Sequence, residues 1–85
     1  TDQAEAVGLR SLQERVAMAL LQLAAADPSG LVRLPQGQIA ALVAATRPKV
    51  NAVLAELRGR GLIEPVRAGL RLSDPAGLRG LAGVW

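Results

Sequence analysis

The stretch Gln38–Gly61, QIAALVAATRPKVNAVLAELRGRG, decides the fold that this chain is expected to adopt. It contains two runs of apolar residues at helical spacing, joined by the short connection Ala44–Thr46. In the second run the apolar residues recur at i, i+3, i+4 and i+7, which makes one stripe along an α-helix: Val50, Val53, Leu54 and Leu57. Thr46 precedes this run as an N-cap, and Pro48 lies in the first turn, where a missing N–H is tolerated. The stretch therefore predicts two helices joined by a tight turn, the second spanning about residues 47–58.

The side of the second helix that faces away from its apolar stripe carries polar and small residues. The polar ones are two arginines, a lysine and an asparagine: Arg47, Arg58, Lys49 and Asn51. The rest of that surface carries side chains that project little from the helix: Pro48, Ala52 and Ala55. A helix that packs by one stripe and presents cations and an amide elsewhere suits the major groove of DNA. An ordinary amphipathic helix with a solvated charged side has the same periodicity, so the order of the surrounding elements has to decide between the two.

Composition excludes several classes of function. Eighty-five residues are enough for one small domain with a single core. The chain has no cysteine and no histidine, which excludes disulfides, thiolate metal sites and the commonest general base. One Trp and no Phe or Tyr leave little for the stacking of single-stranded nucleic acid. The carboxylates are scattered and no Gly-rich phosphate loop appears, so we expect no enzyme activity, no metal and no cofactor in this domain.

No pattern for membrane insertion or export is apparent in the sequence. The longest apolar-rich run, Val16–Ala26, is interrupted by Gln22 and is too short to cross a bilayer. The chain does not open with a signal-peptide pattern. We therefore expect a cytoplasmic protein without a membrane partner. Because the first residue is Thr rather than Met, we also expect a domain of a longer protein.

The net charge of +3 is unevenly distributed along the chain. Residues 1–30 hold two basic and four acidic side chains, a balance of −2, and residues 74–85 are balanced. Residues 31–73 hold seven basic and two acidic side chains, a balance of +5. Positive charge gathered on the helix pair and the segment after it is what a phosphate-facing surface requires. An arginine-rich composition distributed by chance is the alternative explanation.

Two further elements are expected before the helix pair. Apolar residues recur every three or four positions from Leu9 to about Ala26, which predicts a helix with a core face. Residues 1–8 are expected to be the frayed tail of a preceding helix. The turn cluster Asp27–Gly30 ends the predicted helix. Leu31–Leu34 is a short apolar run bounded by turn residues and predicts a strand.

The segment after the helix pair predicts a β-hairpin. Leu62–Val66 and Leu70–Leu72 are short apolar runs on either side of a three-residue turn, Arg67–Gly69. Pro65 restricts its strand to an edge or a bulge. A single hairpin is marginally stable, so we expect Leu31–Leu34 to join it as a third strand.

Signals for helix ends occur twice more. Gly59 and Gly61 are expected to supply the left-handed residues that end the second helix of the pair. Asp74 and Pro75 match an N-cap and a first helical position, and they predict a short last helix. The residues of this helix that should face inward are Leu78 and Leu81.

Helix, strand, helix, turn, helix and hairpin, in this order, form the winged-helix arrangement. The chain resembles the DNA-binding domain of the Crp/Fnr family of bacterial transcription regulators, over roughly residues 13–82. The resemblance rests on four local matches: Glu14–Ala24 in the leading helix, Gln38–Val43, Thr46-Arg47-x-x-Val50, and Leu54-x-x-Leu57 followed by Gly61-Leu62-Ile63. MarR-like and Lrp-like regulators share the arrangement and are the alternative families.

The resemblance implies a fold and a way of binding DNA. The fold is mainly α with a small β-sheet, a winged helix-turn-helix with a three-helix core and a hairpin wing, spanning residues 1–85 as a single domain. Full-length members carry a β-barrel sensor for a cyclic nucleotide or another effector and a long dimerisation helix, and this sequence contains neither. Two copies, as a homodimer, would read a palindromic site on double-stranded DNA. Thr46 matches the family's phosphate contact and Arg47 its guanine contact.

Two positions depart from the family pattern. Pro48 stands where many members have a Glu that accepts from cytosine, and Ala52 stands where well-known members have a second base-reading Arg. Both residues could touch a thymine methyl group, while Lys49 and Asn51 could supply new polar contacts to bases. Reduced specificity is the other outcome that these departures allow.

The sequence thus predicts sequence-specific binding of double-stranded DNA. The residues expected to read bases are Arg47, Lys49, Asn51, Pro48 and Ala52. The residues expected to contact phosphates are Thr46, Arg58, Arg67 and Arg71, although the last two also fit an ordinary solvated hairpin. The alternative is a winged helix that binds protein and not DNA. Such a module would more readily expose an apolar patch than arginine on its second helix.

Overall fold

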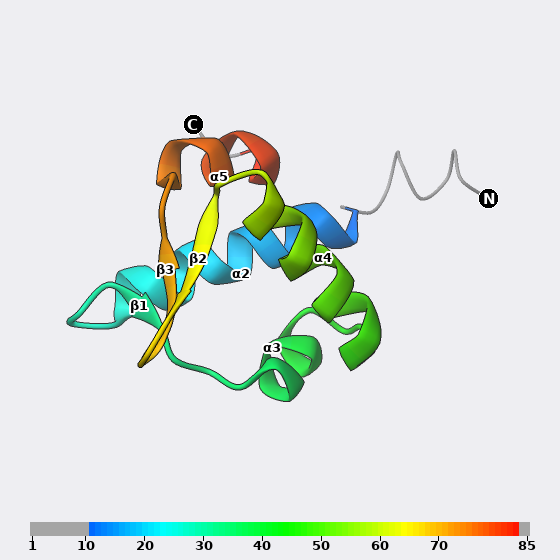
Figure 1. The fold of residues 1–85 in the computed structure, drawn as a ribbon. Coiled ribbons are helices and arrows are strands. Elements are labelled where there is room, and N and C mark those ends of the chain that lie inside the picture. The colour runs from blue at the N-terminus through cyan, green and yellow to red at the C-terminus, as the bar shows by residue number, and fades with distance from the viewer. Residues whose placement is uncertain (1–10, 84–85) are drawn as a thin grey trace.

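The computed structural model describes residues 11–83 (Figure 1). The predicted tail over residues 1–8, the expected helix start at Leu9 and the terminal Trp85 lie outside this range. Between residues 11 and 83 the chain forms four helices and a three-stranded antiparallel sheet. The elements are α2 (Leu12–Ala26), β1 (Leu31–Val32), α3 (Gln36–Leu42), α4 (Arg47–Gly59), β2 (Ile63–Val66), β3 (Gly69–Leu72) and α5 (Pro75–Ala82). Their order and type confirm the predicted winged helix-turn-helix, mainly α with a small sheet.

A capping box at Ser11 sets the beginning of α2. The backbone N–H of Glu14 donates to the Ser11 hydroxyl at 3.1 Å, and the backbone N–H of Ser11 donates to the Glu14 carboxylate at 2.8 Å. Each side chain thus satisfies an N–H that the helix leaves without an internal partner. Ser11 itself is extended, with φ −64° and ψ 161°, so α2 begins at Leu12.

The helix pair forms with the tight turn that the sequence predicts. α3 begins at Gln36 behind Pro35, which makes no side-chain cap, as the lack of a capping residue there suggested. Ala44 takes the left-handed conformation in the turn, with φ 55°. The hydroxyl of Thr46 then caps α4 by accepting from the backbone N–H of Lys49 at 3.4 Å. The left-handed Ala44 and the Thr46 cap thus form the short connection between the two helices.

Of the two glycines expected to take the left-handed conformation at the end of α4, only Gly61 does so. Gly59 is the last residue of the helix, whereas Gly61 adopts φ 75°. The backbone N–H of Leu62 then returns to the carbonyl of Leu57 at 3.0 Å, as in a Schellman ending, where the left-handed residue follows the helix. The prediction was therefore right for Gly61 and wrong for Gly59.

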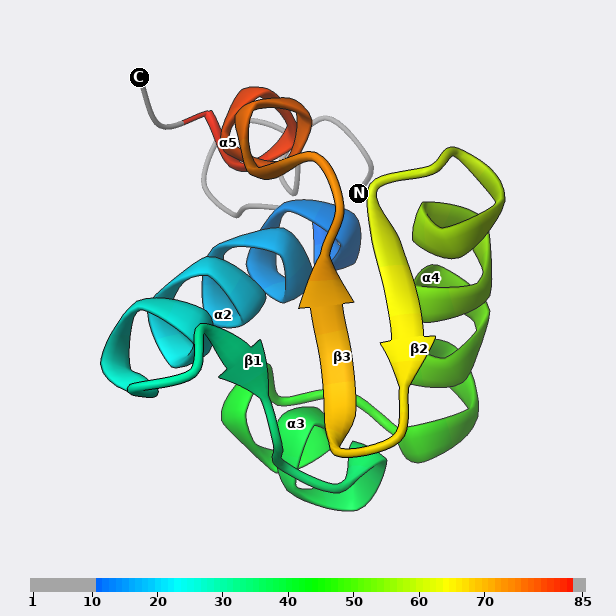
Figure 2. The ribbon, with the colours of Figure 1, turned by 60° about the vertical axis from the view of Figure 1, so that its left-hand side comes forward.

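The sheet has the strand order β1–β3–β2, so the segment before the helix pair does supply the third strand. Figure 2 shows β3 between the other two, with α4 beside β2 and α2 on the side of β1. Val66 pairs with Gly69, so the hairpin turn is the two-residue Arg67–Ala68 and not the predicted three-residue turn. β1 is shorter than predicted: it ends at Val32, which pairs with Leu70 of β3.

Gly69 is required where β1 crosses close to the hairpin. A Cβ atom at this position would lie 2.2 Å from the carbonyl oxygen of Val32, and the φ of Gly69 is +152°. Both the space and the backbone conformation exclude other residues there. Pro65 lies in β2, an edge strand of this sheet, as predicted.

The core lies between α2, the sheet and the other helices. Its largest fully buried side chains come from every helix and from β1: Val16, Leu20, Val32, Ile39, Val50, Leu57 and Leu78. Leu81 packs against the core while half-buried, and Asp74 caps α5 by accepting from the backbone N–H of Gly77 at 3.0 Å. No polar or charged residue is buried within residues 11–83. None of the helices in this range is both long and apolar enough to span a membrane.

Candidate nucleic-acid interface

The buried side of α4 fixes which residues face outward. Val50 and Leu57 are fully buried and Leu54 is nearly so, which anchors this face of the helix against the core. The predicted base-reading residues all lie on the remaining, exposed surface: Arg47, Pro48, Lys49, Asn51 and Ala52. Since one face is held by packing, the helix presents these residues in a fixed orientation.

Four exposed polar side chains of α4 have no partner among residues 11–83, whereas Glu56 pairs with Arg60. Arg47, Lys49, Asn51 and Arg58 make neither a side-chain hydrogen bond nor an ion pair within this range. Guanidinium and amide groups that have no partner within the protein keep all their donors for a ligand. These groups are the ones that read guanine and adenine edges and contact phosphates in the major groove.

The first turn of α4 and the tip of the wing lie along the same edge of the molecule. In Figures 1 and 2 the β2–β3 turn, α3 and the beginning of α4 occupy the lower edge, and α5 lies at the opposite one. The structure therefore brings Thr46, Arg47 and Lys49 to the same edge as Arg67 of the wing turn. Arg58 is eleven residues beyond Arg47, about 16 Å along the helix, and belongs to the other end.

Thr46 has the geometry for two roles. Its Oγ1 accepts from the backbone N–H of Lys49, which uses a lone pair of the hydroxyl oxygen. The hydroxyl hydrogen is not needed for that bond and can be donated to a phosphate oxygen. Thr46 is exposed, so the phosphate contact implied by the family resemblance is sterically open.

The two arginines of the wing differ in their surroundings. Arg67 lies in the exposed turn and has no partner among the described residues. Arg71 lies on β3 opposite Glu64, and its Nη2 is 2.5 Å from Glu64 Oε2. A phosphate contact by Arg71 would have to compete with this carboxylate, whereas Arg67 faces no such competition.

Ion pairs reduce the positive charge that is open to a ligand. Besides Arg71, two of the seven basic side chains in residues 31–73 are paired: Arg60 with Glu56 at 3.9 Å, and Arg33 with Asp27 at 3.4 Å. The four without a partner in the described range are Arg47, Lys49, Arg58 and Arg67. Within residues 31–73 the unpaired positive charge thus lies on α4 and the wing tip, as phosphate contact requires, while Arg79 on α5 is a further cation without a partner in the described range.

A polar cluster that sequence reasoning missed occupies the turn between α2 and β1. Asp27 accepts from the hydroxyl and the backbone N–H of Ser29, and Arg33 also donates to the Ser29 hydroxyl at 2.9 Å. The hydrogen bond from the Ser29 side chain is the largest cause that lowers the pKa of Asp27 below its ordinary value of 3.8. The spacing D-x-S is a common turn signal, so the Asp27–Ser29 contact could have been found from the sequence.

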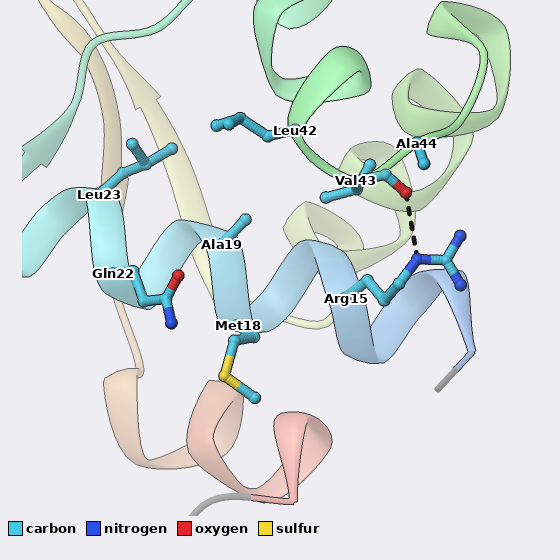
Figure 3. A pocket seen from close by; sticks show the side chains of 8 residues that line it. All are labelled: Arg15, Met18, Ala19, Gln22, Leu23, Leu42, Val43 and Ala44. Carbon is cyan, nitrogen blue, oxygen red and sulfur yellow. Dashed lines mark hydrogen bonds between the residues drawn. The ribbon is translucent and has the colours of Figure 1, made fainter. Parts of the chain in front are cut away.

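An apolar groove between α2 and the end of α3 was also missed (Figure 3). It encloses about 470 Å³, and no residue of α4 lines it. At one end Arg15 Nε donates to the carbonyl of Val43 at 3.1 Å, which ties the two helices together. Leu42 borders the groove and is 60% exposed. It is the one exposed large hydrophobic residue in the described range. Nothing in the local sequence pattern distinguishes Leu42 from a core residue.

The described residues hold no group that resembles a metal site. Over residues 11–83, no three or more acidic side chains come together in a way that could bind a metal ion.

Comparison with known proteins places the chain in a family. Residues 14–81 match the model of the Crp-like helix-turn-helix domain. A search of curated protein sequences returned no significant match. Among solved structures, the CRP-family transcriptional regulator TTHB099 from Thermus thermophilus is similar, with 38% identity and a TM-score of 0.76 over 86% of this chain and 40% of that one.

Two further regulators have the same domain. TTHA1359, a CRP/FNR-family regulator from the same organism, is 28% identical with a TM-score of 0.78, over 96% of this chain and 45% of its own. The Thermus thermophilus catabolite activator protein is 28% identical with a TM-score of 0.75, over 85% of this chain and 34% of its own. The chain spans less than half the length of each of these proteins. It belongs to the family of Crp-like helix-turn-helix domains, the DNA-binding domains of CRP/FNR transcription regulators.

Proposed function

We propose that this domain binds double-stranded DNA sequence-specifically, with α4 in the major groove and Arg47 forming a bidentate contact with a guanine. The observation that carries the proposal is Arg47 itself, exposed in the first turn of a helix whose opposite face is buried. Its guanidinium has no partner among the described residues. A guanidinium presented in this way matches the O6 and N7 acceptors of guanine.

Phosphate contacts would position the helix in the groove. Thr46 offers a hydroxyl hydrogen beside Arg47, and Arg67 offers a guanidinium from the wing turn. Arg58 would contact the backbone at the far end of α4. These contacts fix register and orientation but carry no sequence information of their own.

The longer protein would act in the cytoplasm of a bacterium as a homodimer on a palindromic site. Solved relatives more than twice as long support the presence of a further domain, where an effector such as a cyclic nucleotide would bind. Two domains side by side would meet major grooves about one helical turn apart. This domain would bind no cofactor and catalyse no reaction, in keeping with a family of transcription regulators.

One observation favours a second function, the binding of another protein. Leu42 is exposed beside the apolar groove between α2 and α3, and exposed apolar surface is typical of protein interfaces. The groove contains none of the unpaired cations, so it does not account for the charge on α4 and the wing tip. DNA binding accounts for that charge and is the better supported function.

Selection from a random pool of short DNA duplexes at two salt concentrations tests the proposal. We expect salt-dependent retention and enrichment of a motif that contains a guanine, because phosphate contacts release counterions and Arg47 reads a base. Arg47→Ala should abolish the guanine preference, whereas the matched control Arg33→Ala, which removes a paired cation, should leave the motif unchanged. Failure to retain any duplex at low salt would overturn the proposal and favour protein binding.

A further inference from the structure

The structure separates two residues of α4 that the sequence places almost side by side. Lys49 and Asn51 are two positions apart on a continuous helix, so they point in directions about 160° apart. Asn51 follows Arg47 by four residues and lies on the same face, one turn further along. Arg47 and Asn51 therefore form one row, and Lys49 belongs to the opposite flank.

The centre of the exposed face of α4 carries only small residues. Pro48, Ala52, Ala55 and Gly59 recur at i, i+4, i+7 and i+11 and are all exposed. A long side chain in this row would hold the helix backbone away from the base edges. Without one, the helix can approach closely enough for a short side chain beside the row to reach a base.

Asn51 has the chemistry to use this close approach. Its amide is exposed and makes no hydrogen bond within residues 11–83. An asparagine amide offers one acceptor and a pair of donors, which match N6 and N7 of adenine in a bidentate contact. The ammonium of Lys49 offers donors on a long flexible stem and suits a phosphate on the flank of the groove.

We infer that Asn51 is a second base-reading residue, specific for an adenine one or two base pairs from the guanine read by Arg47, and that Lys49 contacts phosphate. This inference rests on the proposed DNA-binding function. Four residues of helix advance about 6 Å, and successive bases are spaced about 3.4 Å apart, so the adenine lies one or two base pairs from the guanine. The recognised element is thus a guanine and an adenine at this spacing.

Selection from random duplexes with three proteins tests the inference: the 85-residue chain, Asn51→Ala and Lys49→Ala. The unchanged chain should enrich a guanine and an adenine one or two positions apart. Asn51→Ala should keep the guanine, lose the adenine preference, and bind the best duplex about tenfold to a hundredfold more weakly. Lys49→Ala is the matched control on the opposite flank, and it should weaken all duplexes equally and reduce the salt slope by about 1.

Replacing the adenine by 7-deazaadenine examines the contact itself. The analogue lacks the N7 acceptor, so the unchanged chain should bind it more weakly, while Asn51→Ala should bind adenine and the analogue equally. A circular dichroism spectrum unchanged by Asn51→Ala shows that the helix is intact. Loss of the guanine and adenine preferences together, or equal sensitivity of both proteins to the analogue, would refute the role of Asn51.

The inference and the proposed function fail in different ways. If an enriched guanine disappears in Arg47→Ala but no adenine is enriched, or the adenine persists in Asn51→Ala, DNA reading by Arg47 stands and the inference is wrong. If the unchanged chain retains no duplex at low salt, the proposed function is wrong and the inference falls with it.

Discussion

Helix α4 and the β2–β3 wing both carry cations expected to contact DNA, but they hold them differently. On α4, Arg47, Lys49 and Arg58 are exposed without a partner in the described part of the chain. On the wing, Arg71 is bound to Glu64 across the two strands, and Arg67 at the tip is not. The difference teaches that the count of cations overstates the charge a surface offers, because cross-strand pairing uses part of it.

The two regions also differ in how firmly the core holds them, and this difference gives the largest expected effect. Leu57→Ala should lower the free energy of unfolding by about 2–5 kcal/mol, because Leu57 is fully buried under α4. Leu70→Ala on the wing should cost less, because Leu70 is only partly buried. Urea unfolding followed by circular dichroism measures both. Equal losses would show that the wing is anchored as firmly as α4.

Arginine removal compares the two regions for DNA binding. Arg47→Ala should weaken binding to the preferred duplex by about 1–3 kcal/mol and relax the preference at one base pair. Arg71→Ala should change the affinity much less, because Glu64 already neutralises Arg71. Fluorescence anisotropy with a labelled duplex measures both variants. If Arg71→Ala costs as much as Arg47→Ala, its ion pair opens on binding and the contrast between helix and wing disappears.

Releasing Arg71 should make the wing behave more like α4. Glu64→Gln removes the carboxylate charge and leaves Arg71 in place, so a further phosphate contact becomes available. We expect tighter binding at low salt and a salt dependence steeper by up to about 1 in the logarithmic slope. The double variant Glu64→Gln with Arg71→Ala is the control and should not show the steeper slope. An unchanged slope in Glu64→Gln would mean that Arg71 does not reach the DNA.

The smallest expected effect concerns the pKa of Asp27, which lies outside both regions. Asp27 forms a third carboxylate–arginine pair, with Arg33. Its pKa is held below 3.8, mainly by the Ser29 hydroxyl, so its contribution to stability is present above that pH and is lost as the pH falls through the folded-state pKa. Ser29→Ala should move the pKa of Asp27 up toward the ordinary value. It should therefore reduce the stability that is lost on acidification. A titration followed by NMR of the side-chain carboxyl carbon measures the pKa. An unchanged value would assign the shift to the backbone hydrogen bonds or to Arg33.

Local signals in the sequence were sufficient for much of the fold. A cap depends on residues three or four positions apart, so Thr46 and Asp74 could be assigned before the structure. The buried stripe of α4 follows from periodicity alone. The third strand followed from the need to complete a marginal hairpin, and the edge position of Pro65 followed from the missing N–H of proline.

The pairing of Arg71 could not be predicted, because it depends on the hairpin register. A three-residue turn would have placed Arg71 opposite Pro65, whereas the two-residue turn places it opposite Glu64. A change of one residue in a turn thus decides whether a cation is paired. The bond from Arg15 to the Val43 carbonyl joins residues 28 positions apart and has no local signal at all. The proposed base and phosphate contacts stay predictions, since they concern a ligand.

Pro65 has a consequence for how this domain behaves at high concentration. A free strand edge is a template on which a second chain can add its own strand and begin an aggregate. β2 is such an edge, four residues long, and Pro65 removes one of the N–H groups that an added strand would need. An edge strand that carries this proline is therefore a poorer template for self-association. Replacing this proline for the sake of a more regular strand would remove that protection.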